Sequence, residues 1–234
     1  RLVKAMLPGA GAAKGFSVAD IRRVWPEAAL PEARQWFVDN VLGGEIEAAT
    51  MKFAFPVGTL AMGAEPLTIP QNGVFIEMVA DGVSVRPADG MAPIDIEGKL
   101  RLQVHDADVT LAADGGLIRT ERGNLTVTNA AVVVTSETPG ENIVELSGDL
   151  AGGLPAVVAI ANQLQPGALK SDAVPMDLTT LTGGLNVRMV ATAFLDPAMA
   201  VKRMDYSATG NLQDLGASAP VQGHSFGNGQ LSFM

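Results

Sequence analysis

The feature that most constrains this chain is an alternation of apolar and polar residues with a period of two, which runs through most of the sequence after residue 45. Such alternation is typical of strands with one covered and one solvated face. The clearest case places Leu100, Leu102 and Val104 on one side of a strand, with Lys99 and Arg101 on the other. Similar segments recur at roughly ten-residue intervals, which favours an antiparallel sheet.

Turn-forming residues separate these segments. We expect turns at Asp81-Gly82, Asp89-Gly90, Asp114-Gly115-Gly116 and Leu195-Asp196-Pro197, because Asp-Gly pairs and Asp-Pro sequences are common turn formers. Asp106-x-Asp108 begins like a calcium loop, but the residues that follow do not supply the third ligand and glycine, so a hairpin end is predicted there. The glycine-rich tail is expected to hold a last edge strand.

Two helices are expected to interrupt the strands. Pro31 suits a first helical position, after which Ala33, Trp36, Phe37 and Val41 fall on one face. Gly43-Gly44 is predicted to stop this helix. A second helix is predicted near 155–165; its apolar part, residues 154–161, is too short to cross a bilayer.

The predicted fold is therefore mainly β: a largely antiparallel, twisted open sheet, either taco-like or sandwich-like, with two short helices. We expect residues 1–16 to be a linker or the end of a preceding module and residues 17–44 to be a helical lead-in. Residues 45–234 would form a β-rich module, interrupted by the helix near 155–165.

Charge and composition disfavour several classes of function. The net charge is −9 and the 16 basic residues are scattered, so binding to nucleic acid or to an anionic membrane surface is not expected. Cysteine is absent, which removes disulfides, thiol nucleophiles and zinc–thiolate sites.

No arrangement of residues predicts catalysis. Residues 223–227 match G-x-S-x-G, but no acid or histidine follows as an α/β-hydrolase requires. The glycines of residues 9–15 miss the spacing of a phosphate-binding loop, and His105 and His224 lie far apart in the sequence. We therefore expect a protein that is not an enzyme, with no catalytic residue, no cofactor and no metal site.

A sheet with one aliphatic face must cover that face. One solution is a second sheet or helices, which would make a closed core; the other is an apolar groove covered by lipid. The alternation itself is compatible with both. The candidate groove residues are Leu100, Leu102, Val104, Val109, Leu111, Leu125, Val127, Val132 and Val134.

The first helical region carries a family resemblance. It is similar to the lead-in of the AsmA-like superfamily, bacterial envelope proteins that have an AsmA-like C-terminal region and are related to the TamB-type bridge proteins. The residues that carry this likeness are Trp25-Pro26, Pro31-x-Ala33-Arg34-x-Trp36, Asn40 and Gly43-Gly44-x-Ile46. Residues 87–115, 146–166 and 204–215 resemble later strands and a helix of the family more loosely.

The resemblance implies a periplasmic segment of a protein that is anchored to the inner membrane outside this segment. It implies a non-catalytic hydrophobic groove for phospholipid transport between membranes and for outer-membrane biogenesis and homeostasis. The expected partners are phospholipid acyl chains and neighbouring modules of the same bridge-like chain. Trp25, Trp36, Phe37 and Val41 would form a helical cap on the sheet, or else simply pack in a core. The alternative function is a structural or interaction β-sandwich domain of an extracytoplasmic protein.

Overall fold

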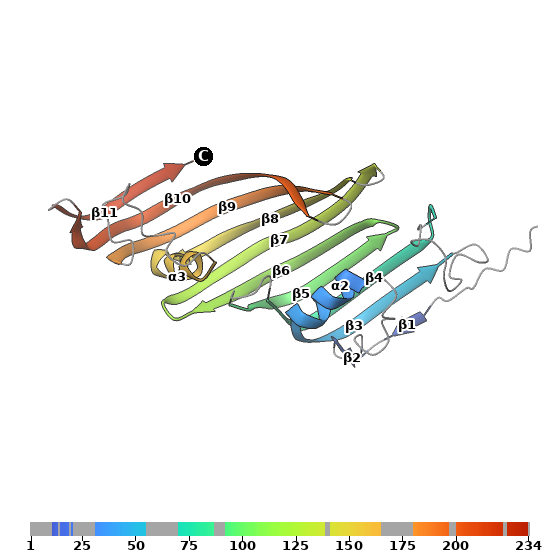
Figure 1. Cartoon of the computed structure of the whole chain (residues 1–234). Helices are drawn as coiled ribbons and strands as arrows, with labels where there is room; N and C mark the ends of the chain where they lie inside the picture. Colours follow the sequence, from blue (N-terminus) through green and yellow to red (C-terminus); the bar gives the residue numbers. More distant parts are fainter. Residues whose placement is uncertain are drawn as a thin grey trace, which may run out of the picture.

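The structure, a computed structural model, describes residues 11–13, 15–18, 20, 31–54, 70–86, 92–138, 141–164, 180–196, 200–221 and 224–233. Nine long strands form one open antiparallel sheet, with two short strands at one edge and two described helices (Figure 1). This confirms the mainly β, open antiparallel prediction. The elements are β1 (Gly11–Ala13), β2 (Phe16–Ser17), α2 (Pro31–Asn40), β3 (Val41–Phe53), β4 (Val74–Val85), β5 (Ile94–His105), β6 (Asp108–Thr120), β7 (Gly123–Thr138), β8 (Glu141–Gly153), α3 (Leu154–Leu164), β9 (Leu181–Leu195), β10 (Val201–Val221) and β11 (His224–Phe233).

The sheet is a meander. From β3 to β11, each strand pairs with the strands that precede and follow it in the sequence. The short strands β1 and β2, which fall in the expected linker and lead-in, both pair with β3. β11 forms the opposite edge, as the glycine-rich tail predicted. All described strands belong to one sheet, so they do not form the two packed sheets of a sandwich.

Residues that oppose each other in an antiparallel ladder share a face of the sheet. The register of neighbouring strands therefore assigns each described strand residue to one of two faces. We call one of them the apolar face. Across the central strands it carries Ala49, Met51, Ile76, Met78, Leu100, Leu102, Val104, Val109, Leu111, Leu125, Val127, Val132, Val134, Val144, Leu146, Leu150, Leu185, Val187, Met189 and Ala191. The other, polar face carries many charged and amide side chains.

Helix α2 begins at Pro31, as predicted, and ends at Asn40. The predicted stop at Gly43-Gly44 is wrong, because both glycines lie inside β3. Gly44 has φ +134°, and a Cβ there would lie 2.8 Å from Cγ2 of Val83, so this glycine serves strand packing rather than a helix end. Val41 is the first residue of β3 and not part of the helix.

Helix α3, Leu154–Leu164, agrees with the helix predicted near 155–165. It follows β8 directly and packs against one end of the sheet, where it contacts residues of strands β6, β7, β8 and β9. Figure 1 shows α2 and α3 on the same side of the twisted sheet. The three core clusters beside these helices agree with this, because each contains residues of the apolar face.

Two predicted turns are wrong. Asp81-Gly82 lies inside β4, where Gly82 has φ +59° and the pairing with β5 shifts register, which is the signature of a β-bulge. Asp114 and the two glycines after it lie inside β6. The hairpin end at Asp106 and the break after Leu195 are confirmed. Asp89-Gly90 lies outside the described residues.

Candidate functional site

The candidate site is the part of the apolar face that the described helices do not reach. Two rows of apolar side chains cross seven neighbouring strands here, from β4 to β10, and we call them the apolar rows. Each member of a row opposes the next across a strand pair. The first row is Ile76, Val104, Val109, Val134, Val144, Ala193 and Met204, and the second is Met78, Leu102, Leu111, Val132, Leu146, Ala191 and Tyr206.

Six of the nine candidate groove residues lie in the apolar rows: Leu102, Val104, Val109, Leu111, Val132 and Val134. All six are half-buried. Strands in a sheet lie about 4.8 Å apart, so a row that crosses seven strands spans roughly 29 Å. The rows thus make a continuous aliphatic strip that runs across the strands.

The other three candidates lie toward the helix-covered end of the same face. Leu100 is 9% exposed and belongs to a core cluster with Ile46 and Val83. Leu125 is 1% exposed in a second cluster that includes Ala156 of α3, and Val127 packs against that cluster. The sequence analysis chose all nine residues as groove candidates but contained no information on which of them the helices would cover. Leu125 and Val132 share a face only because the pairing of β7 with β8 shifts register between Thr128 and Ala131.

The structure adds residues that the sequence analysis did not select. Leu146 is 41% exposed, Met189 is 49% exposed and Tyr206 is 81% exposed, although all three lie on the apolar face. Leu146 and Met189 are large apolar side chains that a closed core would bury. Their alternation was readable in the sequence, but their neighbours Ala191 and Ala193 are small, and the pattern there is correspondingly weak.

Of the expected helical cap, only Phe37 and Val41 have described side chains. Phe37 is half-buried and packs against a cluster that includes Val18, Val41 and Ile46. Trp25 lies outside the described residues. Trp36 lies in α2, but its side chain lies outside the described part.

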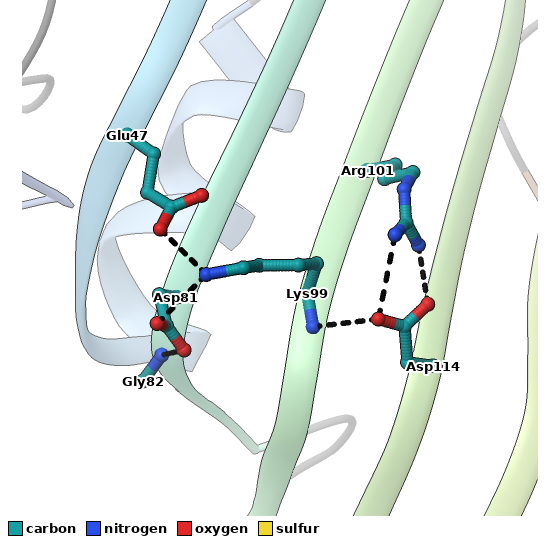
Figure 2. A network of polar contacts seen from close by, with 6 residues as sticks. All are labelled: Glu47, Asp81, Gly82, Lys99, Arg101 and Asp114. Carbon is teal, nitrogen blue, oxygen red and sulfur yellow. Dashed lines mark hydrogen bonds and ion pairs between the residues drawn. The ribbon is translucent and has the colours of Figure 1, made fainter.

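The polar face carries a belt of charges at the level of the bulges (Figure 2). The Lys99 ammonium contacts Oε1 of Glu47 at 2.5 Å and Oδ2 of Asp81 at 2.9 Å. The Arg101 guanidinium pairs with Asp114, whose Oδ2 also accepts the backbone N–H of Lys99 at 3.0 Å. These groups are about one-third to one-half exposed, so solvent screens the pairs and their contribution to stability is small. The belt links neighbouring strands from β3 to β6 through ion pairs.

The belt shifts the ionisation of its members in the directions expected for ion pairs. Hydrogen bonding by Lys99 lowers the pKa of Asp81, and the Glu47 carboxylate raises the pKa of Lys99. The Arg101 guanidinium lowers the pKa of Asp114. Asp81, Lys99 and Asp114 are therefore charged at neutral pH.

Asp106 provides a pH-dependent contact at the hairpin end. Its carboxylate accepts the backbone N–H of Val74 at 3.0 Å and that of Asn72 at 2.7 Å, and these bonds lower its pKa below 3.8. A lowered pKa stabilises the fold above about pH 4, and this contribution is lost as pH falls through the folded-state pKa. We expect Asp106→Asn to lower the thermal midpoint at pH 7.

This difference from the wild type should shrink as the pH falls through the lowered pKa of Asp106, because protonation removes the charge that the substitution removes. Thermal unfolding followed by circular dichroism from about pH 7 to about pH 2 measures it. Asp214→Asn is the matched control, because Asp214 is exposed and has φ +52°, a conformation that Asn also adopts. A difference for Asp106→Asn that stayed constant with pH would contradict the assignment.

The G-x-S-x-G segment falls in a strand: residues 224–227 belong to β11, whereas a hydrolase elbow joins a strand to a helix. Within the described ranges, no three His, Asp or Glu side chains are placed to hold a metal ion. None of the described helices is long and apolar enough to cross a membrane.

Comparisons with known proteins give no relative for this chain. No protein-family model, no curated protein and no solved structure matches it.

Proposed function

We propose that this chain is a non-catalytic lipid-binding module whose apolar rows hold phospholipid acyl chains. One observation carries the proposal: two unbroken rows of apolar side chains cross seven strands, and of their members only Met78 and Leu111 pack against the core clusters that α2 and α3 join. Within the described ranges, neither row is covered by a second sheet. Most row members are half-buried, and Leu146, Met204 and Tyr206 are exposed. An extended, partly exposed apolar surface of this kind is typical of a binding surface.

The energetics suit acyl chains. Transfer of a hydrocarbon chain out of water gains about 0.8 kcal/mol per CH₂, so a sixteen-carbon chain gains roughly 13 kcal/mol. The hydrocarbon core of a bilayer, two opposed acyl layers, is about 30 Å thick, so one acyl chain extends over about half of an apolar row of roughly 29 Å.

The composition of the rows suits a lipid that moves. Val, Leu, Ile, Ala and Met side chains offer many similar contacts along the row, with no aromatic platform except Tyr206 at the β10 edge and no charged side chain. Many weak and equivalent contacts hold a chain without one deep energy minimum. A phospholipid can then slide across the strands while its head group remains in water.

The resemblance to the AsmA-like superfamily supports the same proposal and gives it a setting. In the setting that this resemblance implies, the chain is a periplasmic segment of an inner-membrane-anchored envelope protein. The apolar rows of the chain then continue into neighbouring modules of that protein. Phospholipid transport that maintains the outer membrane would be the role of the whole chain. The net charge of −9 leaves lipid binding to the apolar contacts rather than to head-group attraction.

Native mass spectrometry with lipid extraction tests the proposal on the protein purified from a bacterial envelope fraction. We expect about one or two phospholipids per chain. The test variant combines Leu102→Lys with Leu111→Glu; these residues oppose each other in the apolar rows, so the new charges pair across the strands and preserve the sheet. Bound lipid should fall at least about tenfold, because the strip is interrupted by charge.

The control combines Gln103→Lys with Thr110→Glu, the adjacent opposed pair on the polar face, which changes charge identically. It should retain lipid at the wild-type level. Circular dichroism and thermal unfolding establish that both double variants are folded. A lipid-free wild type that unfolds cooperatively would contradict the proposal and favour the structural β-domain, as would equal lipid content in the two double variants.

A further inference from the structure

The far edge of the sheet has a segment without a neighbouring strand. β10 has 21 residues, but its pairing with β11 begins only at Gly210 and runs toward Val221. On the outer side of residues 201–209, no strand pairs with β10 in the described part of the chain. Among the described residues, the outward backbone N–H and C=O groups of this segment have no strand partner, so they can extend the sheet.

This segment, residues 201–207, is exposed at every position. Tyr206 is 81% exposed, Val201 58% and Met204 51%. Met204 and Tyr206 lie on the apolar face, where they end the two apolar rows. Arg203 and Asp205 lie on the polar face and contact each other at 2.8 Å. The free edge therefore combines large apolar side chains on one face with opposite charges on the other.

We propose that the free edge of β10 pairs antiparallel with the same segment of a second copy of this chain. The two-fold axis passes through Met204, perpendicular to the sheet. In this register Arg203 of each copy opposes Asp205 of the other, which creates two opposed charge pairs, and Met204 opposes its own equivalent. Opposite charges and apolar groups that oppose each other across strands stabilise a pair of strands.

Neighbouring registers are less favourable. For the apolar faces of both copies to lie on the same side, residues of the same face must oppose each other, so the axis must pass through a residue. An axis at Arg203 would set two guanidinium groups opposite each other, and an axis at Asp205 would do the same with two carboxylates. Like charges that oppose each other across strands are destabilising. An axis at Tyr206 brings no opposite charges together.

The dimer would join the two sheets edge to edge. The first apolar row of one copy would continue into that of the other through the opposed Met204 side chains, Tyr206 would oppose Lys202, and the exposed edge would be removed. Because these contacts involve only the edge residues, dimerisation does not depend on the lipid-binding proposal, and each can fail without the other.

Analytical ultracentrifugation over a protein concentration series tests the dimer. The wild type should form a concentration-dependent dimer. Arg203→Asp should weaken it about tenfold, since both cross-strand charge pairs become repulsive, and Asp205→Arg should do the same. The double variant, Arg203→Asp with Asp205→Arg, restores opposite charges and should recover the dimer. A wild type that stays monomeric at all concentrations would overturn the proposal.

The absence of cysteine from the chain permits a direct test of the register. Under mild oxidation, Met204→Cys should form a disulfide-linked dimer, because opposed residues bring their Cβ atoms within disulfide range. Ser207→Cys, at an equally exposed position of the same strand, opposes Val201 of the other copy and should stay unlinked. Equal disulfide formation by the two cysteine variants, or by Ser207→Cys alone, would contradict the register. This holds even if the charge variants at Arg203 and Asp205 change dimerisation as expected.

Discussion

Leu125→Ala is expected to lower the free energy of unfolding by about 3 kcal/mol. Leu125 is 1% exposed and packs in a cluster with Ile118 and with Ala156 of α3. Its removal leaves a cavity between the helix and the sheet, and neither can collapse freely into it, since α3 follows β8 without a loop. Denaturant unfolding, with its midpoint and slope, measures the change.

Leu146→Ala is the matched control for this prediction. The same atoms are deleted from the same face of the sheet, but Leu146 is 41% exposed and lies in the apolar rows. We expect a loss below about 1 kcal/mol, because an exposed side chain leaves no cavity. Similar losses for Leu125→Ala and Leu146→Ala would mean that the two ends of the face are covered alike, contrary to the structure.

Gly44→Val is expected to destabilise the fold by a similar amount, about 3 kcal/mol, for a reason that involves the backbone. Gly44 has φ +134°, a conformation that costs other residues about 1–3 kcal/mol. A Cβ at this position would also lie 2.8 Å from Cγ2 and 3.1 Å from Cα of Val83, and 3.2 Å from Cγ2 of Val18. Strand β3 would have to move away from β4, which the thermal midpoint and the unfolding free energy both report.

Gly43→Val provides the control at the adjacent position. A Cβ at Gly43 meets no atom within 4 Å, and this glycine does not have a positive φ. Valine also favours strands. We therefore expect a change within about 0.5 kcal/mol. If Gly43→Val proved as damaging as Gly44→Val, the cost would come from the loss of a flexible glycine pair rather than from the close approach of Val83.

The sequence predicts the strands well where both faces are distinct. The alternation through Leu100, Leu102 and Val104 is reproduced in the register of β5, and Pro31 marks the observed start of α2. It predicts breaks in strands poorly. An Asp-Gly pair whose glycine has a positive φ occurs both in hairpin turns and in β-bulges. Which of the two structures forms depends on whether the strand continues to pair beyond the glycine. Gly82 is such a bulge.

The candidate site was predictable in its face but not in its extent. Period-two alternation marks Leu102 and Leu125 as members of apolar stripes in their own strands, and the register places both stripes on the same face of the sheet. Which of the two is covered depends on where α3 lies after it leaves β8, and that is a tertiary contact with no local signal. The sequence could not predict the exposed positions of β10 either, because the free edge depends on the point at which β11 begins to pair with β10.

The meander order of the strands bears on how such a chain can change in length. Each long strand depends for its backbone hydrogen bonds on the strands next to it in the sequence, and no described connection crosses over another strand. Stability in such an arrangement is approximately a sum over neighbouring interfaces, as in repeat proteins. Duplication or deletion of one whole hairpin keeps the direction of every remaining strand and alters only one interface. A span of any length can therefore evolve two strands at a time, while the fold at each end stays unchanged.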